Sequence, residues 1–130
     1  MTLEVALVTP EQEVWSGSAQ RLIAKTLDGD IGILTGHAPV IGVLAAGSVV
    51  RILDTEGQEV SAAVTGGFLS VRDDRISVLA AGAELGGDVD VHAVQSELDR
   101  LLEESGPPGA VEPPDVAYAR ALLRAAGTSD

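Results

Sequence analysis

Residues 76–102 read ISVLAAGAELGGDVDVHAVQSELDRLL and contain the point where the chain changes its hydrophobic period. Before Gly86-Gly87, apolar and polar residues alternate as in half-buried strands. After this pair, the apolar residues follow the three-four spacing of an amphipathic helix. Those residues are Val91, Val94, Leu98, Leu101 and Leu102. The sequence therefore predicts a β-built domain over residues 1–86 and a helical domain over 87–130.

From Leu3 to Ala81, turn residues divide the chain into segments of about five to eight residues, the usual length of strands between turns. In the first segment Leu3, Val5 and Leu7 fall on one face. This spacing predicts an antiparallel β-sandwich or barrel. Two segments, Val40–Leu44 and Val49–Leu53, are apolar on both faces, so we expect a partner or a loop to cover their outer side.

The helical domain is predicted to be a hairpin. Asp88 or Asp90 can cap a first helix of about four turns. Prolines and glycines over residues 105–114 then predict an extended hinge. A second helix of about twelve residues, or 18 Å, can run from Asp115 to Gly127, which suits a C-terminal cap.

Composition excludes several classes of function. The 130 residues carry a net charge of -12 with a pI near 4.3, so nucleic acid would be repelled. Aromatic residues make up 2%, which leaves little for stacking on bases, and the absence of cysteine removes thiol chemistry. No targeting segment or membrane span is evident, so we expect a soluble cytoplasmic protein.

The segment DGDIGILTGHAP, residues 28–39, concentrates glycines, acids and one of two histidines. Its glycines suit a bulge and a turn, whereas Asp30 and His37 are not required by a turn and favour a contact surface. Asp28, Asp30 and His37 could instead hold a metal for hydrolysis, but no ligand spacing or nucleophile motif accompanies them.

Two further motifs have structural explanations. Gly66-Gly67 lacks the phosphate-loop pattern and is predicted either to allow two backbones to approach closely or to turn between strands, with Phe68 in the core. Arg120 and Arg124 share a helix face with small alanines. That face is either solvated or docks on an acidic partner.

A string of motifs in residues 3–85 resembles the epsilon subunit of bacterial F-type ATP synthase. Its segments are VTPE (8–11), VWSG (14–17), DGDIGIL (28–34), GHAP (36–39), GGFLSV (66–71), VLA (78–80) and Ala83-Glu84. The resemblance implies a sandwich of about ten antiparallel strands followed by two helices. It also implies a non-catalytic rotor subunit without a cofactor, which couples c-ring rotation to the catalytic head.

The resemblance implies partners and a location as well. Within the family the subunit binds gamma in the central stalk and the polar loops of the c-ring, and the complex places it at the cytoplasmic face of the cell membrane. The c-ring contact maps onto Asp30, Gly36, His37, Ala38 and Pro39. Thr35 stands where the family usually has proline, which frees the local φ.

In this family the helical tail can reach catalytic beta subunits and inhibit ATP hydrolysis, and in some members it binds ATP. The ATP signature places Asp and Arg three apart, whereas Asp115 and Arg120 are five apart and fall on different helix faces. Arg120 and Arg124 are the cations available for a regulatory contact in an acidic tail, which predicts weak inhibition. A nucleotide-sensing module is the alternative function.

Overall fold

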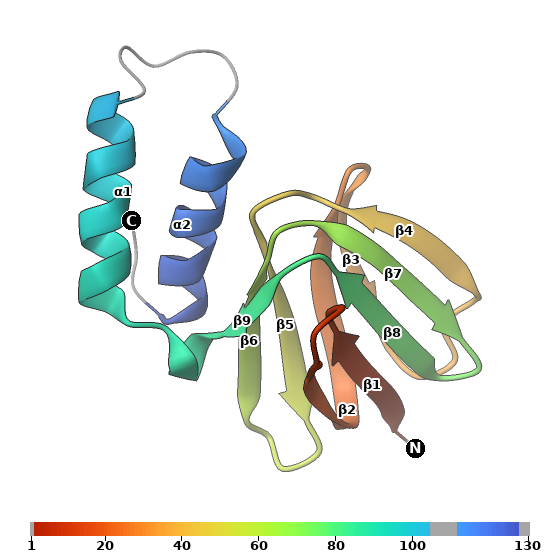
Figure 1. Ribbon diagram of the computed structural model, residues 1–130. Helices are drawn as coiled ribbons and strands as arrows, with labels where there is room; N and C mark the ends of the chain where they lie inside the picture. Colours follow the sequence, from red (N-terminus) through yellow and green to blue (C-terminus); the bar gives the residue numbers. More distant parts are fainter. Residues whose placement is uncertain (1, 105–111, 128–130) are drawn as a thin grey trace.

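The structure, a computed structural model, describes residues 2–104 and 112–127. Within these residues, nine strands precede a short 3-10 helix and two α-helices (Figure 1). The strands are β1 (Leu3–Val8), β2 (Glu13–Thr26), β3 (Gly29–Ile33), β4 (Val40–Leu44), β5 (Ser48–Asp54), β6 (Glu59–Val64), β7 (Gly67–Arg72), β8 (Arg75–Ala80) and β9 (Ala83–Leu85). The helices are η1 (Gly86–Asp88), α1 (Val91–Glu104) and α2 (Pro114–Ala125). Most of the predicted hinge, residues 105–111, lies outside the described residues.

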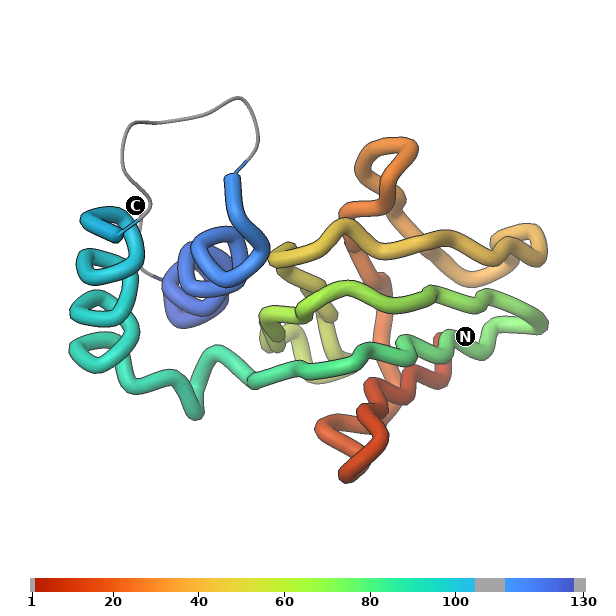
Figure 2. The backbone as a smooth tube through the Cα atoms, turned by 45° about the horizontal axis from the view of Figure 1, so that its top comes forward, coloured from red at the N-terminus to blue at the C-terminus, as the bar shows by residue number. Residues whose placement is uncertain are grey.

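The strands form the two layers of a sandwich, and the long strand β2 joins them. One layer has the order β3, β2, β5, β6, β9, and the other has the order β1, β8, β7, β4. The first part of β2 pairs with β1, while its last part pairs with β3 and β5. Figure 2 shows the two helices to one side of this sandwich.

The predicted ten antiparallel strands are corrected in number and in direction. The described residues contain nine strands, and β1 runs parallel to β8, with Val5 opposite Ile76. The other edge of β1 pairs antiparallel with β2. A hydrophobic pattern fixes which residues face the core, but it carries no information on the direction of a distant neighbouring strand.

The core between the layers is aliphatic, as the composition requires. Leu3, Val5 and Leu7 are buried on one face of β1, which confirms the predicted alternation. The predicted close approach at Gly67 is also confirmed, because a Cβ atom there would lie 2.0 Å from the Leu79 carbonyl oxygen. The prediction that Phe68 fills the core is wrong. Its side chain is 55% exposed, because the alternation of β7 buries the neighbouring Leu69 instead.

The start of each α-helix and the end of α2 fall where local chemistry favours them. The Ala93 N–H donates to Asp90 Oδ1 at 3.1 Å, which confirms an aspartate cap for α1. The second helix starts one residue earlier than expected, at Pro114, since proline lacks only an N–H that the first turn leaves unpaired. Gly127 follows its end with φ of +92°, as the predicted cap requires.

The helix α2 is packed on two sides. Toward α1 it forms a small apolar cluster of Leu98, Leu101, Val116, Ala119 and Leu123. Toward the sandwich, Ala121 and Ala125 pack on Ala63 of β6. Val49 and Tyr118 lie against this alanine contact. The chain's own second helix, rather than a partner or a loop, therefore covers the outer face of β5 at Val49.

Candidate functional site

β3 forms an edge of the sandwich, since among the described strands it pairs with β2 alone. Asp30 lies near its beginning, opposite Lys25 on β2, and is exposed. Past its end, residues 34–39 form a turn in which Gly36, Ala38 and Pro39 are exposed. The edge of β3 and this turn are called the β3 surface below, and they contain every residue predicted to meet the c-ring.

The turn at 34–39 is ordered by its own backbone and by His37. The His37 N–H donates to the Leu34 carbonyl at 3.2 Å. The His37 ring is 2.7 Å from the Ala38 carbonyl oxygen through Nδ1. Because a carbonyl only accepts, Nδ1 carries the hydrogen, and in the neutral ring Nε2 is then an acceptor. His37 is thus oriented by the turn that contains it.

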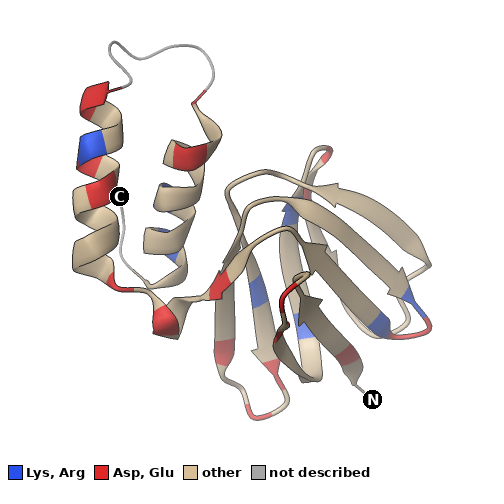
Figure 3. Ribbon diagram, in the orientation of Figure 1, with Lys and Arg blue, Asp and Glu red and all other residues tan. Residues whose placement is uncertain are grey.

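A carboxylate from another hairpin holds the same turn. The Gly36 N–H donates to Asp74 Oδ1 at 2.7 Å, across 38 residues of sequence. Asp74 belongs to the β7–β8 turn, where it and Asp73 have φ of 62° and 51°. This acidic turn, flanked by Arg72 and Arg75, appears at the end of the β7–β8 hairpin in Figure 3. The local sequence around Asp74 carries no signal for this contact, because the contact exists only once the hairpin has folded.

The predicted site residues do not converge into a metal centre. Asp30 lies near the start of β3, whereas His37 lies beyond its end. Asp28 belongs to the β2–β3 turn, where its N–H donates to Thr26 Oγ1 at 3.1 Å. Among the residues that the structure describes, no three His, Asp or Glu side chains gather as ligands of a metal ion would.

An exposed apolar strip crosses three neighbouring strands on the outer face of the other layer. Val43 on β4 pairs with Phe68 on β7, and Phe68 pairs with Leu79 on β8. Their side chains are 44%, 55% and 51% exposed, and Ile41 on β4 is 77% exposed. A continuous strip of exposed aliphatic and aromatic side chains marks an interaction surface. The sequence indicated it through the two-sided apolar pattern of β4.

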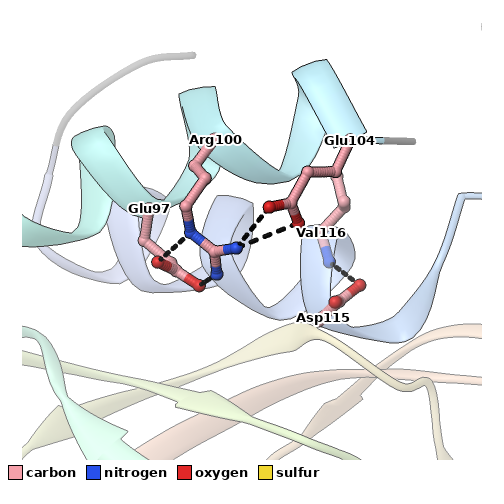
Figure 4. Close-up of polar contacts among 5 residues, drawn as sticks. All are labelled: Glu97, Arg100, Glu104, Asp115 and Val116. Carbon is pink, nitrogen blue, oxygen red and sulfur yellow. Dashed lines mark hydrogen bonds and ion pairs between the residues drawn. The ribbon is translucent and has the colours of Figure 1, made fainter. Parts of the chain in front are cut away.

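The tail residues have partners within the chain. The guanidinium of Arg120 pairs with Glu112 Oε2 at 2.8 Å. Arg124 Nη2 donates to the Gly47 carbonyl on the β4–β5 turn at 3.4 Å. Asp115 Oδ1 accepts from the Val116 N–H at 2.9 Å (Figure 4). The structure thus directs Asp115 and Arg120 to different groups, and the face carrying Arg124 is not simply solvated.

Charge pairs on α1 are exposed and local. Arg100 binds Glu97 one turn back and Glu104 one turn on, at 2.8 Å to Glu104 Oε1 (Figure 4). The hydrogen bond from Arg100 lowers the pKa of Glu97, and the two carboxylates raise the pKa of Arg100. Solvent screens such pairs, so they support the helix and carry no chemistry.

Tyr118 is the titratable group at the contact of α2 with the sandwich. Burial, and secondarily the negative charge of Glu84, raises the pKa of Tyr118 above its ordinary value. Tyr118 packs against a cluster that includes Ala63 of β6, and Glu84 belongs to β9, so the sandwich contributes to the raised pKa.

Comparison with known proteins places this architecture in a class. Residues 2–86 match the family described as "ATP synthase, Delta/Epsilon chain, beta-sandwich domain". The ATP synthase epsilon chain of Thermobifida fusca is 49% identical over 126 residues, covering 95% of this chain and 91% of that one. The epsilon chain of Frankia casuarinae is 53% identical over 85 residues, covering 65% of this chain and 99% of that one.

The chain therefore belongs to the ATP synthase epsilon chain family, whose members are non-catalytic subunits of that complex. The fold also matches a chain of the Euglena gracilis mitochondrial ATP synthase with a TM-score of 0.75 at 16% identity, covering 97% of this chain and 79% of that one. A chain of the Tetrahymena thermophila mitochondrial enzyme matches with a TM-score of 0.57 at 19% identity, covering 97% and 91%. Neither described helix is long and apolar enough to cross a membrane.

Proposed function

We propose that this chain is a rotor subunit of the central stalk, which works with gamma to transmit c-ring rotation to the catalytic head. Family membership supports an ATP synthase role. The Tetrahymena structure that shares its fold is entitled "central stalk/cring". The single observation that carries the proposal is the β3 surface, whose turn is tied to a second hairpin by the Gly36–Asp74 hydrogen bond.

The β3 surface suits contact with the polar loops of the c-ring. Asp30 offers a carboxylate and His37 an imidazole, and both can hold basic or amide groups. Gly36, Ala38 and Pro39 add an exposed surface without long side chains, so a partner backbone can approach closely. A contact that transmits torque must be rigid. The hydrogen bond from Gly36 to Asp74 restricts the motion of the turn that carries His37.

The apolar strip suits the interface with gamma. Val43, Phe68 and Leu79 lie in register on three paired strands, so they present a continuous surface rather than scattered side chains. A permanent subunit contact buries such a surface, because burial of apolar area is its main source of affinity. A central-stalk subunit needs one face that contacts the c-ring and another that contacts gamma, which rotates together with the c-ring.

We propose that the helical tail inhibits ATP hydrolysis only weakly. The docked α2 must leave β5 and β6 before Arg120 and Arg124 can reach a catalytic beta subunit. The Frankia relative is matched over 99% of its length by 85 residues, about the size of the sandwich, so a tail is not a constant feature among relatives. We also propose that the chain lies peripherally at the cytoplasmic face of the cell membrane, as a part of the ATP synthase complex.

Alanine variants at the β3 surface test the coupling function. Asp30→Ala and His37→Ala should lower ATP-driven proton pumping relative to ATP hydrolysis in inverted vesicles, without loss of the cooperative thermal transition of the isolated chain. Glu56→Ala, on the exposed β5–β6 turn, is the control and should pump normally. Unchanged pumping in both variants, or unfolding of either, would overturn the assignment of these residues.

A further inference from the structure

A pocket of about 380 Å³ lies between the sandwich and the end of α2. Its walls come from β2, the beginning of β3, the β4–β5 turn, β5 and α2. The lining residues are Ile23, Ala24, Lys25, Asp30, Ala45, Ala46, Gly47, Ser48, Val49, Arg51 and Arg124. Asp30 is the one lining residue that also belongs to the β3 surface, and the other lining residues lie outside the predicted c-ring and gamma surfaces.

The charge of the lining is opposite to that of the molecule. Three of the chain's eight Lys and Arg residues line it, namely Lys25, Arg51 and Arg124, against one carboxylate, Asp30. Three positive groups and one negative group give the lining +2, in a chain of net charge -12. Gathering cations at one place costs repulsion unless an anion is held there.

These cations are only partly satisfied by the protein. Arg51 pairs with Glu59 at 3.3 Å, and both side chains are nearly half exposed. Within residues 2–104 and 112–127, neither Lys25 nor Arg124 forms an ion pair. The bond from Arg124 to the Gly47 carbonyl is long, at 3.4 Å, and uses one of five guanidinium donors. Donors therefore remain for a ligand.

The donor set indicates the chemistry of that ligand. Two guanidinium groups and an ammonium group match the tetrahedral oxygens of phosphate, which accept charge-assisted hydrogen bonds. The pocket has room for more than one phosphate group. No aromatic side chain lines it, so a nucleotide base would find no ring to stack on.

We propose that this pocket binds a small phosphate-class polyanion such as pyrophosphate, held by Lys25 and Arg51 of the sandwich and Arg124 of α2. The site is complete only while α2 lies on the sheet, because Arg124 is the contribution of that helix. It is separate from Asp115 and Arg120, the pair considered for ATP. Anion binding in this pocket also does not depend on the rotor function, so a test can contradict one proposal without contradicting the other.

Titration of the isolated full chain with pyrophosphate tests the proposal. Amide NMR signals of residues 45–49 and 124 should shift saturably when ionic strength is matched with sodium chloride. Lys25→Gln, Arg51→Gln and Arg124→Gln should each weaken binding about tenfold, as expected for loss of a charge-assisted hydrogen bond. Arg72→Gln is the control. It removes the same charge at a side chain that pairs with Asp73 and does not line the pocket, so this variant should bind normally.

The remaining arms distinguish phosphate recognition from other causes. Tripolyphosphate and ATP should bind with equal affinity if the pocket recognises only their phosphate groups. ATP binding more than tenfold tighter would show a base site and overturn the proposal. If sodium chloride reproduced the NMR shifts, or if Arg72→Gln weakened binding as much as the pocket variants do, binding would depend only on the overall charge of the protein. Either result would overturn the proposal. Unchanged signals elsewhere in each variant's spectrum establish that its fold is intact.

Discussion

Asp74 and Gly36 are joined by a 2.7 Å hydrogen bond that ties the β7–β8 hairpin to the turn carrying His37. The bond runs from a backbone N–H to a carboxylate, and such charge-assisted bonds are stronger than neutral ones. It adds a side-chain bond beside the antiparallel pairing of β4 with β7, in which Val40 lies opposite Val71. The position of the β3 surface therefore depends on a residue that makes no contribution to that surface itself.

Removing the Asp74 carboxylate should loosen the turn without unfolding the sandwich. Because Asp74 has φ of 62°, Asp74→Gly removes the side chain without backbone strain. We expect the Gly36 amide to exchange with solvent about tenfold faster, which corresponds to loss of about 1.4 kcal/mol of local protection. Hydrogen exchange by NMR measures this. Asp74→Asn keeps an acceptor oxygen and tolerates the same φ, so it should retain most of the protection; equal exchange in both variants contradicts the role of the hydrogen bond.

The sequence predicted the parts of the fold that depend on neighbouring residues. The change of period at Gly86-Gly87 and an aspartate cap on the first helix follow from local patterns, and the structure confirms both. Of the two alternatives for Gly66-Gly67, the structure shows the close approach, at Gly67. The parallel pairing of β1 with β8 was missed, because it depends on how distant segments meet. The error at Phe68 has a related cause: alternation identifies two faces of a strand but not which one is covered.

The candidate site was predictable to a similar extent. Asp30 and His37 were identified by their chemistry in an unusual segment, and both lie on an accessible surface of the structure, although its contacts remain a prediction. Asp74 was not identifiable, since its partner is 38 residues away. The pocket lined by Lys25, Arg51 and Arg124 was equally hidden, because its cations come from three separate elements.

Gly47 is expected to control docking of α2. A Cβ atom at this residue would lie 2.6 Å from the Ala117 carbonyl carbon, so Gly47→Ala should push the helix off the sheet. Gly57→Ala is a matched control, because Gly57 also has positive φ but open space around it. Both variants carry a backbone cost of about 1 kcal/mol, and only Gly47→Ala adds the clash. Faster exchange of the Ala121 amide in Gly47→Ala alone is the expected result; equal exchange in the two variants would show that α2 tolerates the added methyl group.

Alkaline pH should weaken the same contact through Tyr118. Its pKa is raised in the docked state, so the docked state holds the phenol proton more tightly than the undocked state does. The stabilisation is fully present below the ordinary pKa of about 10 and is lost as pH rises through the raised value. As the only tyrosine, Tyr118 gives an unambiguous ultraviolet titration. In Gly47→Ala the midpoint should return toward the ordinary value, and an identical midpoint in both proteins would contradict this account.

The apolar strip predicts a variant that separates assembly from stability. Phe68→Ser should shift the thermal transition of the isolated chain little, because surface substitutions usually change stability by about 0.5 kcal/mol or less. It should nevertheless reduce co-purification with gamma, since an aromatic side chain at the centre of an interface often dominates its affinity. Leu69→Ser, at the buried neighbouring residue, should instead destabilise the chain itself. Normal co-purification of Phe68→Ser would exclude the strip as the gamma interface.

Deletion of residues 106–130 tests the weak inhibitory role of the tail in the assembled enzyme. We expect only a small change in ATP hydrolysis, because the tail carries few cations and its second helix is docked on β5 and β6. The deletion also exposes Ala63, so a second variant is needed. Ala63→Cys combined with Ala121→Cys can lock α2 to the sheet by oxidation in a chain without native cysteine. Oxidised and reduced enzyme should hydrolyse ATP at similar rates. A many-fold rise on deletion, matched by a rise on oxidation, would instead show that a released tail is a strong inhibitor.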